Sequence, residues 1–242
     1  MQLVVTLVAT VLYAAFNPRH SAELAEQTIS SNSIALLVAS NCLCVLVFAL
    51  ICRVRNSSLS EKASINAMPP RVLPQVAVLG VVSTYAVNVI LSILIVAKAI
   101  PSSWVTMLEE TNSDFAVASP AMLFISTVIM APVLEEILFR GLILGTLKKT
   151  MHPWIAIVIS SVIFGLAHGT PIGILYATCL GILMGWLTVK FNSILPSMMF
   201  HMAYNATVSY SEGMSVIALV ACFPVMIYMI ILINKNFRGD KK

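Results

Sequence analysis

The chain has 242 residues, of which 59% are apolar and only 10% are charged, and its formal net charge is +4. A soluble domain carries roughly 25% charged residues, so this composition, with a mean hydropathy of +0.96, excludes a water-soluble globular protein. No CxxC pair occurs among the five cysteines, so neither a disulfide framework nor a thiolate zinc site is indicated.

Eight apolar stretches approach the ~20 residues that a membrane-spanning helix needs, although the first and the fifth are short. Prolines mark several of their boundaries, as expected for residues that end a helix or occupy its first turn. We therefore expect an all-α, polytopic integral membrane bundle of about eight transmembrane helices. The expected spans are 2–16, 34–52, 74–97, 119–147, 153–168, 171–189, 193–210 and 214–233, with 101–118 as the only sizeable acidic connecting loop.

The positive charges predict the orientation of these spans, because Lys and Arg concentrate in cytoplasmic loops. With the N-terminus inside, the only Lys and Arg residues of the outer segments are Arg19 and Lys98, and Arg140 lies within the membrane. We therefore expect a multi-pass cell-membrane protein with both termini cytoplasmic and with the lipid bilayer as its partner. No concentrated basic face is left over to bind nucleic acid. The inner segments contain Arg53, Arg55, Lys62, Arg71, Lys148, Lys149, Lys190, Lys235, Arg238, Lys241 and Lys242.

The fourth span contains the sequence Ala-Pro-Val-Leu-Glu-Glu-Ile-Leu-Phe-Arg-Gly, in which the charged residues are Glu135, Glu136 and Arg140. Charges inside hydrocarbon are costly, so they usually pair or face a hydrated cavity. Glu136 and Arg140 are four residues apart and share a helix face, so they can pair. Glu135 projects about 100° away and stays free to act as a general base. The alternative is a structural ion pair between helices, but it gives Glu135 no purpose.

Two further spans contain polar residues at four-residue spacing. Phe164 and His168 end the short fifth span, which rises only about 22 Å, so the turn after it is expected to lie below the outer membrane surface. His201 and Asn205 lie on one face of the seventh span, where two hydrogen-bond donors suit a developing oxyanion. Helix capping and hydrogen bonding between helices are the simpler alternatives for these residues.

Together the three patches supply a base, two imidazoles and an amide, which is the inventory of a hydrolytic site. Glu135, His168 and His201 equally form the His₂Glu set that holds a catalytic zinc. A Zn²⁺ ion therefore stays open as a cofactor, and no other cofactor is indicated. Neither His-Glu-x-x-His nor Gly-x-Ser-x-Gly occurs, which argues against the usual helical zinc-protease arrangement and a serine nucleophile.

The three patches resemble the motifs of the CPBP family of intramembrane proteases, which includes CAAX prenyl endopeptidases and bacterial Abi or bacteriocin-immunity proteins. Glu135, Glu136 and Arg140 match its Glu-Glu-x-x-x-Arg motif. Phe164 with His168, and His201 with Asn205, match its second and third motifs in order. The resemblance implies that Glu135 and His168 activate water, that His201 and Asn205 stabilise the oxyanion, and that Glu136 and Arg140 hold the site together. The family has been described as both metal-dependent and glutamate-type.

The chain divides on this basis into three parts of one compact membrane domain. Residues 1–118 form N-terminal transmembrane helices without a recognised motif. Residues 119–210 form the CPBP-like catalytic core. Residues 211–242 form the last transmembrane helix and a basic cytoplasmic tail.

The favoured function is an intramembrane endopeptidase that acts on a membrane-associated peptide or protein, with a lipidated or CAAX-like tail as one substrate class. The alternative is a non-catalytic immunity or scaffold protein of the bacteriocin self-protection type, which would use the same polar cluster for packing. A proton-coupled transporter ranks last, because no internal repeat is found. The paired glycines Gly181 and Gly185 predict a close helix contact within the bundle.

Overall fold

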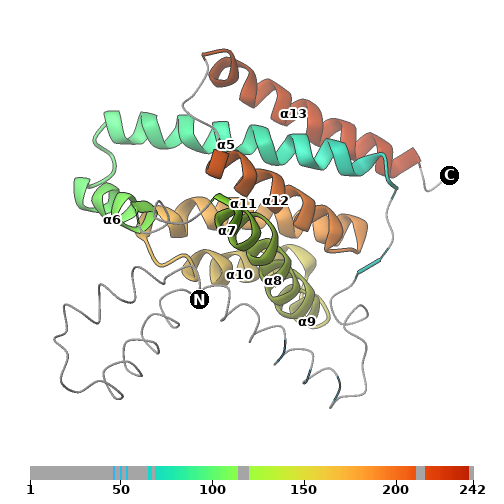
Figure 1. The fold of residues 1–242 in the computed structure, drawn as a ribbon. Coiled ribbons are helices and arrows are strands. Elements are labelled where there is room, and N and C mark those ends of the chain that lie inside the picture. Colours follow the sequence, from blue (N-terminus) through green and yellow to red (C-terminus); the bar gives the residue numbers. More distant parts are fainter. Residues whose placement is uncertain are drawn as a thin grey trace, which may run out of the picture.

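The computed structural model describes residues 69–113, 120–210 and 216–239, with isolated positions 46, 50, 53, 65 and 66 before them. All regular elements in this part of the chain are helices (Figure 1). The expected spans 2–16 and 34–52 lie outside the described residues, apart from positions 46 and 50. The helices are α5 (Val72–Val96), α6 (Ser102–Ser113), α7 (Pro120–Leu123), η1 (Phe124–Met130), α8 (Ala131–Glu135), η2 (Glu136–Leu144), α9 (Gly145–Leu147), α10 (Pro153–Leu166), α11 (Pro171–Phe191), α12 (Leu195–Tyr210) and α13 (Val216–Gly239).

Three of the described helices are long and apolar enough to cross a membrane: Val72–Val96, the continuous run Pro120–Leu147 and Pro171–Phe191. They correspond to the expected spans 74–97, 119–147 and 171–189. The expected spans 153–168, 193–210 and 214–233 are helical over residues 153–166, 195–210 and 216–233, and Pro153–Leu166 and Val220–Asn236 form shorter apolar helices. The helical fold class is therefore confirmed for the described residues.

The acidic connector 101–118 is not a plain loop, because α6 occupies residues 102–113. Trp104, Val105 and Leu108 are its partly buried apolar side chains, and their spacing places them along one side of the helix. The exposed Glu109 and Glu110 occupy other positions. The apolar residues of this segment have a helical period, which the acidic residues obscure in the sequence.

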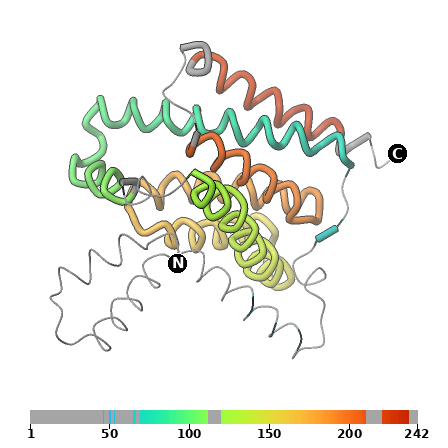
Figure 2. Tube along the Cα trace, in the orientation of Figure 1, coloured from blue at the N-terminus to red at the C-terminus, as the bar shows by residue number. Residues whose placement is uncertain are grey.

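The segment 120–147 runs at a steep angle to α5, α12 and α13 (Figure 2). It is not a uniform α-helix, because η1 and η2 are π-helical. π-Helical turns are rare and occur frequently at functional sites. Here they flank α8, the short helix that ends at Glu135.

The packing of α5 against α12 and α13, and of α10 against α11, forms most of the described bundle. Glycines allow the closest approaches. A Cβ at Gly181 would lie 3.0 Å from the Cβ of Ser161, and a Cβ at Gly185 would lie 3.0 Å from Cγ2 of Ile157. The Gly-x-x-x-Gly pair thus marks the contact between α10 and α11 inside the bundle, as its sequence predicted.

Gly80→Ala is expected to destabilise the protein by about 1–3 kcal/mol, because a Cβ there would collide with the backbone carbonyl of Phe200 and lie 3.0 Å from the Cβ of Ala203. Gly145→Ala is the matched control, since its Cβ would meet only the carbonyl of Arg140 at 3.7 Å. Thermal unfolding in detergent compares the two variants. Equal melting temperatures would show that α5 and α12 do not approach as closely as described.

Candidate active site

Glu136 and Arg140 form a buried ion pair at the start and middle of η2. Their side chains are 0% and 1% exposed, and Nη1 of Arg140 lies 3.2 Å from Oε1 of Glu136. The guanidinium also stacks 4.1 Å from the centre of the Phe164 ring, and its Nη2 donates to the Gly181 carbonyl at 3.4 Å. Arg140 therefore connects η2 to both α10 and α11, so that one side chain fixes three helices.

His201 lies between the two glutamates. Its Nδ1 is 3.0 Å from Oε1 of Glu136, and its Nε2 is 3.7 Å from Oε2 of Glu135. A carboxylate can only accept a hydrogen bond, so Nδ1 carries a proton and donates it to Glu136. This bond orients the imidazole of α12 so that Nε2 faces the Glu135 carboxylate.

The two neighbouring glutamates have different surroundings. The Glu136 side chain is fully buried, whereas that of Glu135 is 29% exposed and lines a cavity. Consecutive helix residues project about 100° apart. The helix face with Glu136 is directed toward Arg140 and Nδ1 of His201, so the Glu135 side chain is directed toward the cavity.

His168 lies in the turn between α10 and α11. Its Nδ1 is 3.0 Å from the carbonyl oxygen of Phe164, which can only accept, so Nδ1 donates. In the neutral ring, Nε2 then carries the free lone pair. The Phe164 ring makes edge contacts with both histidines, with centroid distances of 4.8 Å to His168 and 5.8 Å to His201. Gly169, at φ 77°, allows the turn that follows.

Asn205 anchors α12 to the wide turn of η1. Its Nδ2 donates to the carbonyl of Thr127 at 2.8 Å. The N–H of Ala131 bonds the carbonyl of Ser126, five residues back, and Pro132 has no N–H to offer. The carbonyl of Thr127 therefore lacks its usual partners within the helix, and the amide of Asn205 satisfies it. The second N–H of this amide is not used by that bond.

These side chains surround a cavity of about 460 Å³ between α5, α6, the segment 120–135, α10, α11 and α12. Its wall combines a polar group of residues with a larger apolar surface. The polar lining consists of Asn88, Thr127, Glu135, His168, Tyr176, His201, Tyr204, Asn205 and Ser209; the apolar lining consists of Val87, Leu91, Leu108, Leu123, Phe164, Ala177, Leu180, Met184, Phe200 and Val208.

Of the six residues singled out from the sequence, four line this cavity: Glu135, His168, His201 and Asn205. Glu136 and Arg140 lie behind it. His201 and Asn205 were expected to supply two oxyanion donors, but fewer of their N–H groups are free than their spacing suggests. One N–H of Asn205 is engaged by Thr127, and Nδ1 of His201 is engaged by Glu136. His201 can donate into the cavity from Nε2 only when the ring is doubly protonated.

The proposed metal ligands share the cavity but do not form a compact ligand set. Among the residues that the structure describes, no three His, Cys, Asp or Glu side chains are placed so that they could hold a metal ion. Both imidazoles do keep Nε2 on the cavity side of a ring that is oriented through Nδ1, a common arrangement for metal-binding histidines. In this arrangement the three residues do not fit a zinc ion.

The sequence motifs do not include several residues that line the cavity. Tyr176 lies with its ring 6.3 Å from that of His168, and Tyr204 is one helical turn beyond His201. Their helical spacing gives a signal: Tyr176, Leu180 and Met184 repeat every four residues on α11. Asn88 of α5 has no such signal, because α5 contains no motif residue.

Comparison with known proteins agrees with the motifs. Residues 117–207 match the family described as type II CAAX prenyl endopeptidase Rce1-like. The chain is 34% identical over 102 residues to "Putative membrane peptidase YdiL" of Bacillus subtilis (strain 168), which covers 41% of this chain and 41% of that relative's length. No solved structure matches the chain. Residues 117–207 are therefore similar to the Rce1-like (CPBP) family of type II CAAX prenyl endopeptidases, which confirms the resemblance drawn from the three motifs.

Proposed function

We propose that the protein is an intramembrane endopeptidase that hydrolyses a peptide bond of a membrane-associated substrate with water activated by Glu135 and His168. The observation that carries this proposal is the placement of a partly exposed carboxylate and two imidazoles on one cavity wall inside apolar helices. The family match covers the same residues. A lipidated or CAAX-like tail is one substrate class that the family description suggests.

The proposed reaction begins with a water molecule between Glu135 and His168. Neutral His168 accepts one of the water's hydrogen bonds at Nε2, since its Nδ1 donates to the Phe164 carbonyl. The Glu135 carboxylate accepts the other and removes that proton as the oxygen attacks the substrate carbonyl carbon. Glu135 then returns the proton to the leaving nitrogen as the C–N bond breaks, so the products are a carboxylic acid and a free amine.

The negative charge that develops on the substrate oxygen needs a donor in the cavity wall. Doubly protonated His201 donates from Nε2, and Asn205 donates from the N–H that Thr127 does not use. Glu136 supports the imidazolium of His201 through the 3.0 Å contact with Nδ1. Arg140 holds Glu136 in place, so this buried pair acts on the reaction by orienting His201.

We place the protein in the cell membrane with about eight spans and with both termini cytoplasmic. The support is the distribution of Lys and Arg along the sequence, together with the three long apolar helices of the described region. The bilayer and a membrane peptide are the partners that this arrangement requires.

A non-catalytic scaffold is the second candidate, and the buried network favours it. Arg140 contacts Glu136, Phe164 and Gly181, and these contacts would stabilise the bundle without any reaction. The scaffold does not account for Glu135, whose partly exposed carboxylate lines the cavity. Glutamine at position 135 separates the two functions, because a scaffold tolerates it and a peptidase does not.

Cleavage by the purified protein is expected to survive incubation with a strong chelator, because no three ligands gather in the described part of the chain. The test compares the cleavage rate before and after chelation, with zinc content measured on the same sample. Loss of activity that added Zn²⁺ restores would contradict this expectation. It would instead support a zinc ion held by Glu135, His168 and His201.

A further inference from the structure

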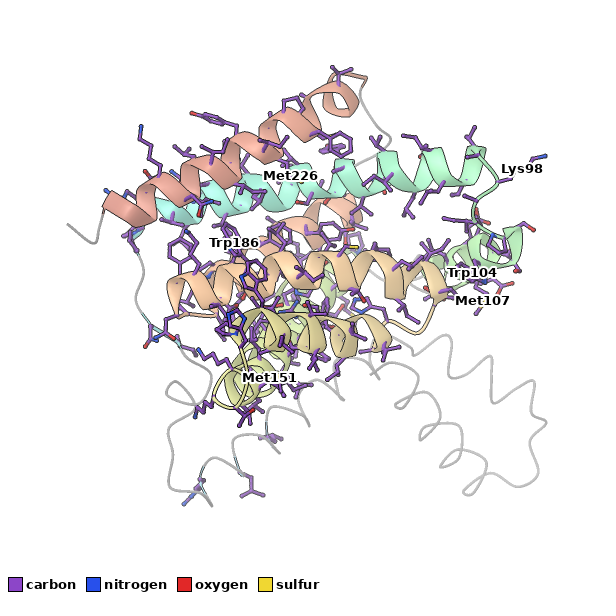
Figure 3. The ribbon with its side chains drawn as sticks, turned by 180° about the vertical axis from the view of Figure 1, so that it is seen from behind. Lys98, Trp104, Met107, Met151, Trp186 and Met226 are labelled. Carbon is purple, nitrogen blue, oxygen red and sulfur yellow. The ribbon has the colours of Figure 1, made fainter. Side chains whose placement is uncertain are left out.

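Basic residues collect at one end of the described bundle. This end contains Arg71 before α5, Lys148 and Lys149 after α9, Lys190 in the last turn of α11 and Lys235 near the end of α13. At the opposite end, the described residues contain only one Lys, Lys98, together with α6 and the turn 167–170. Figure 3 places Lys98 at the same end as Trp104 and Met107 of α6. By the positive-inside tendency, the basic end is cytoplasmic and the end with α6 is extracytoplasmic.

Hydrogen bonds link several helix ends at the cytoplasmic end. Lys190 Nζ donates to Asn234 at 2.6 Å, and Lys148 Nζ donates to the side chain of Asn192 at 3.2 Å. Asn192 also accepts a bond from Asn66 through its carbonyl. These contacts connect α11, α13 and the segment after α9 at one level of the bundle.

Apolar packing fills the same half. Leu144, Ala156 and Ile157 form a buried cluster at the junction of η2 and α10, with Ile182 and Val189 of α11 packed against it. In the same half, the hydroxyl of Thr188 donates to that of Ser197 at 3.0 Å, and both residues are buried. In the described part of the chain, a peptide that approached Glu135 through this half would have to displace these buried side chains.

The cavity extends from the middle of the bundle into the other half. On α5 its lining begins at Val87, past the middle of the helix, and on α10 it is formed by the C-terminal end. On α11 the lining ends at Met184, well before the basic last turn. Leu108 of α6, the helix of the extracytoplasmic end, forms part of the wall itself.

From this placement we propose that the active-site cavity is entered from the extracytoplasmic side of the membrane. Its substrate is then an extracytoplasmic segment of a membrane-anchored peptide, and this inference selects that class over the cytoplasmic CAAX-like tail that the family description suggests. Apolar side chains flank the bond that is cut, because Val87, Leu91 and Leu108 line the wall beyond the polar residues. The statement about the substrate rests on the proposed peptidase function. The membrane face from which the cavity is entered does not depend on that function.

Cysteine labelling in intact cells tests the side of access. The five native cysteines are replaced, and single cysteines are introduced by Ser209→Cys in the cavity wall and by Lys149→Cys at the basic end. Cells that express each variant are treated with a membrane-impermeant maleimide before or after permeabilisation. Ser209→Cys is expected to be labelled in intact cells, and Lys149→Cys only after permeabilisation. Labelling of Lys149→Cys alone in intact cells, or protection of Ser209→Cys in both conditions, would overturn the inference.

A measurement of cleavage in the same cells separates this inference from the peptidase proposal. Labelling needs no catalysis, so the expected pattern without any cleavage would reject the peptidase and leave the side of access standing. If cleavage occurs, labelled Ser209→Cys is expected to lose it in intact cells, because the adduct fills the cavity. Cleavage by Lys149→Cys is expected to be unaffected by the same treatment. Equal cleavage by labelled and unlabelled Ser209→Cys would contradict access through this cavity.

Discussion

Glu135→Gln is expected to reduce the cleavage rate by about 10²–10⁴-fold while the protein stays folded, because the amide keeps the shape of the side chain but cannot accept the proton of water. The substituted group is 29% exposed and makes only a 3.7 Å contact with His201, so few structural interactions depend on its charge. Cleavage of an apolar peptide by purified protein in lipid vesicles measures the rate. Circular dichroism during heating measures the fold.

The matched control is Glu109→Gln, which removes an exposed carboxylate of α6. It is expected to leave both the rate and the melting temperature unchanged. Full turnover by Glu135→Gln would reject Glu135 as the base and would favour the scaffold, which needs only shape and hydrogen bonding at this position.

Arg140→Met is expected to lower the free energy of unfolding by about 3–5 kcal/mol, because it leaves the buried Glu136 carboxylate without its cation. The loss of the stacking contact with Phe164 adds to this effect. Equilibrium unfolding in mixed detergent measures the difference. The double variant Glu136→Gln with Arg140→Met is expected to recover part of the lost stability, since neither buried charge then remains.

Lys149→Met is the control for removal of a cation at an exposed position, and it is expected to change stability by less than about 1 kcal/mol. An Arg140→Met protein as stable as the parent would show that the ion pair does not hold η2 against α10 and α11. The double variant is also expected to cleave slowly, because His201 loses the carboxylate that orients it.

The contacts that could be predicted from the sequence are those within one helix. The pairing of Glu136 with Arg140, and the separation of Glu135 from it, follow from 3.6 residues per turn. The packing of Gly181 against α10 was also within reach, because small residues at this spacing allow helices to approach closely.

The contacts between helices could not be predicted, because they depend on how far one helix is displaced along another. His201 contacts both glutamates only at the register that α12 adopts against α8. The bond from Asn205 to Thr127 requires in addition the wide turn of η1, which frees a carbonyl that an α-helix with Ala131 as donor would occupy. A donor that the spacing assigned to the oxyanion therefore also has a structural partner.

The cavity itself depends on helices that contain no motif. Asn88 of α5 and Leu108 of α6 line it, yet both lie before the region that matches the family. Since these helices contribute to the apolar wall, residues outside the matched region are expected to decide which peptides fit. The length and polarity of the individual spans do not indicate which peptides fit the cavity.

The most direct measurement maps the N-terminal residues of membrane proteins in cells that express either the parent protein or Glu135→Gln at equal levels. The account predicts new N-termini, within or next to apolar segments, that appear with the parent protein and are missing with the variant. Identical sets of N-termini in the two membranes would contradict it, because a buried site built around Glu135 would then cut nothing.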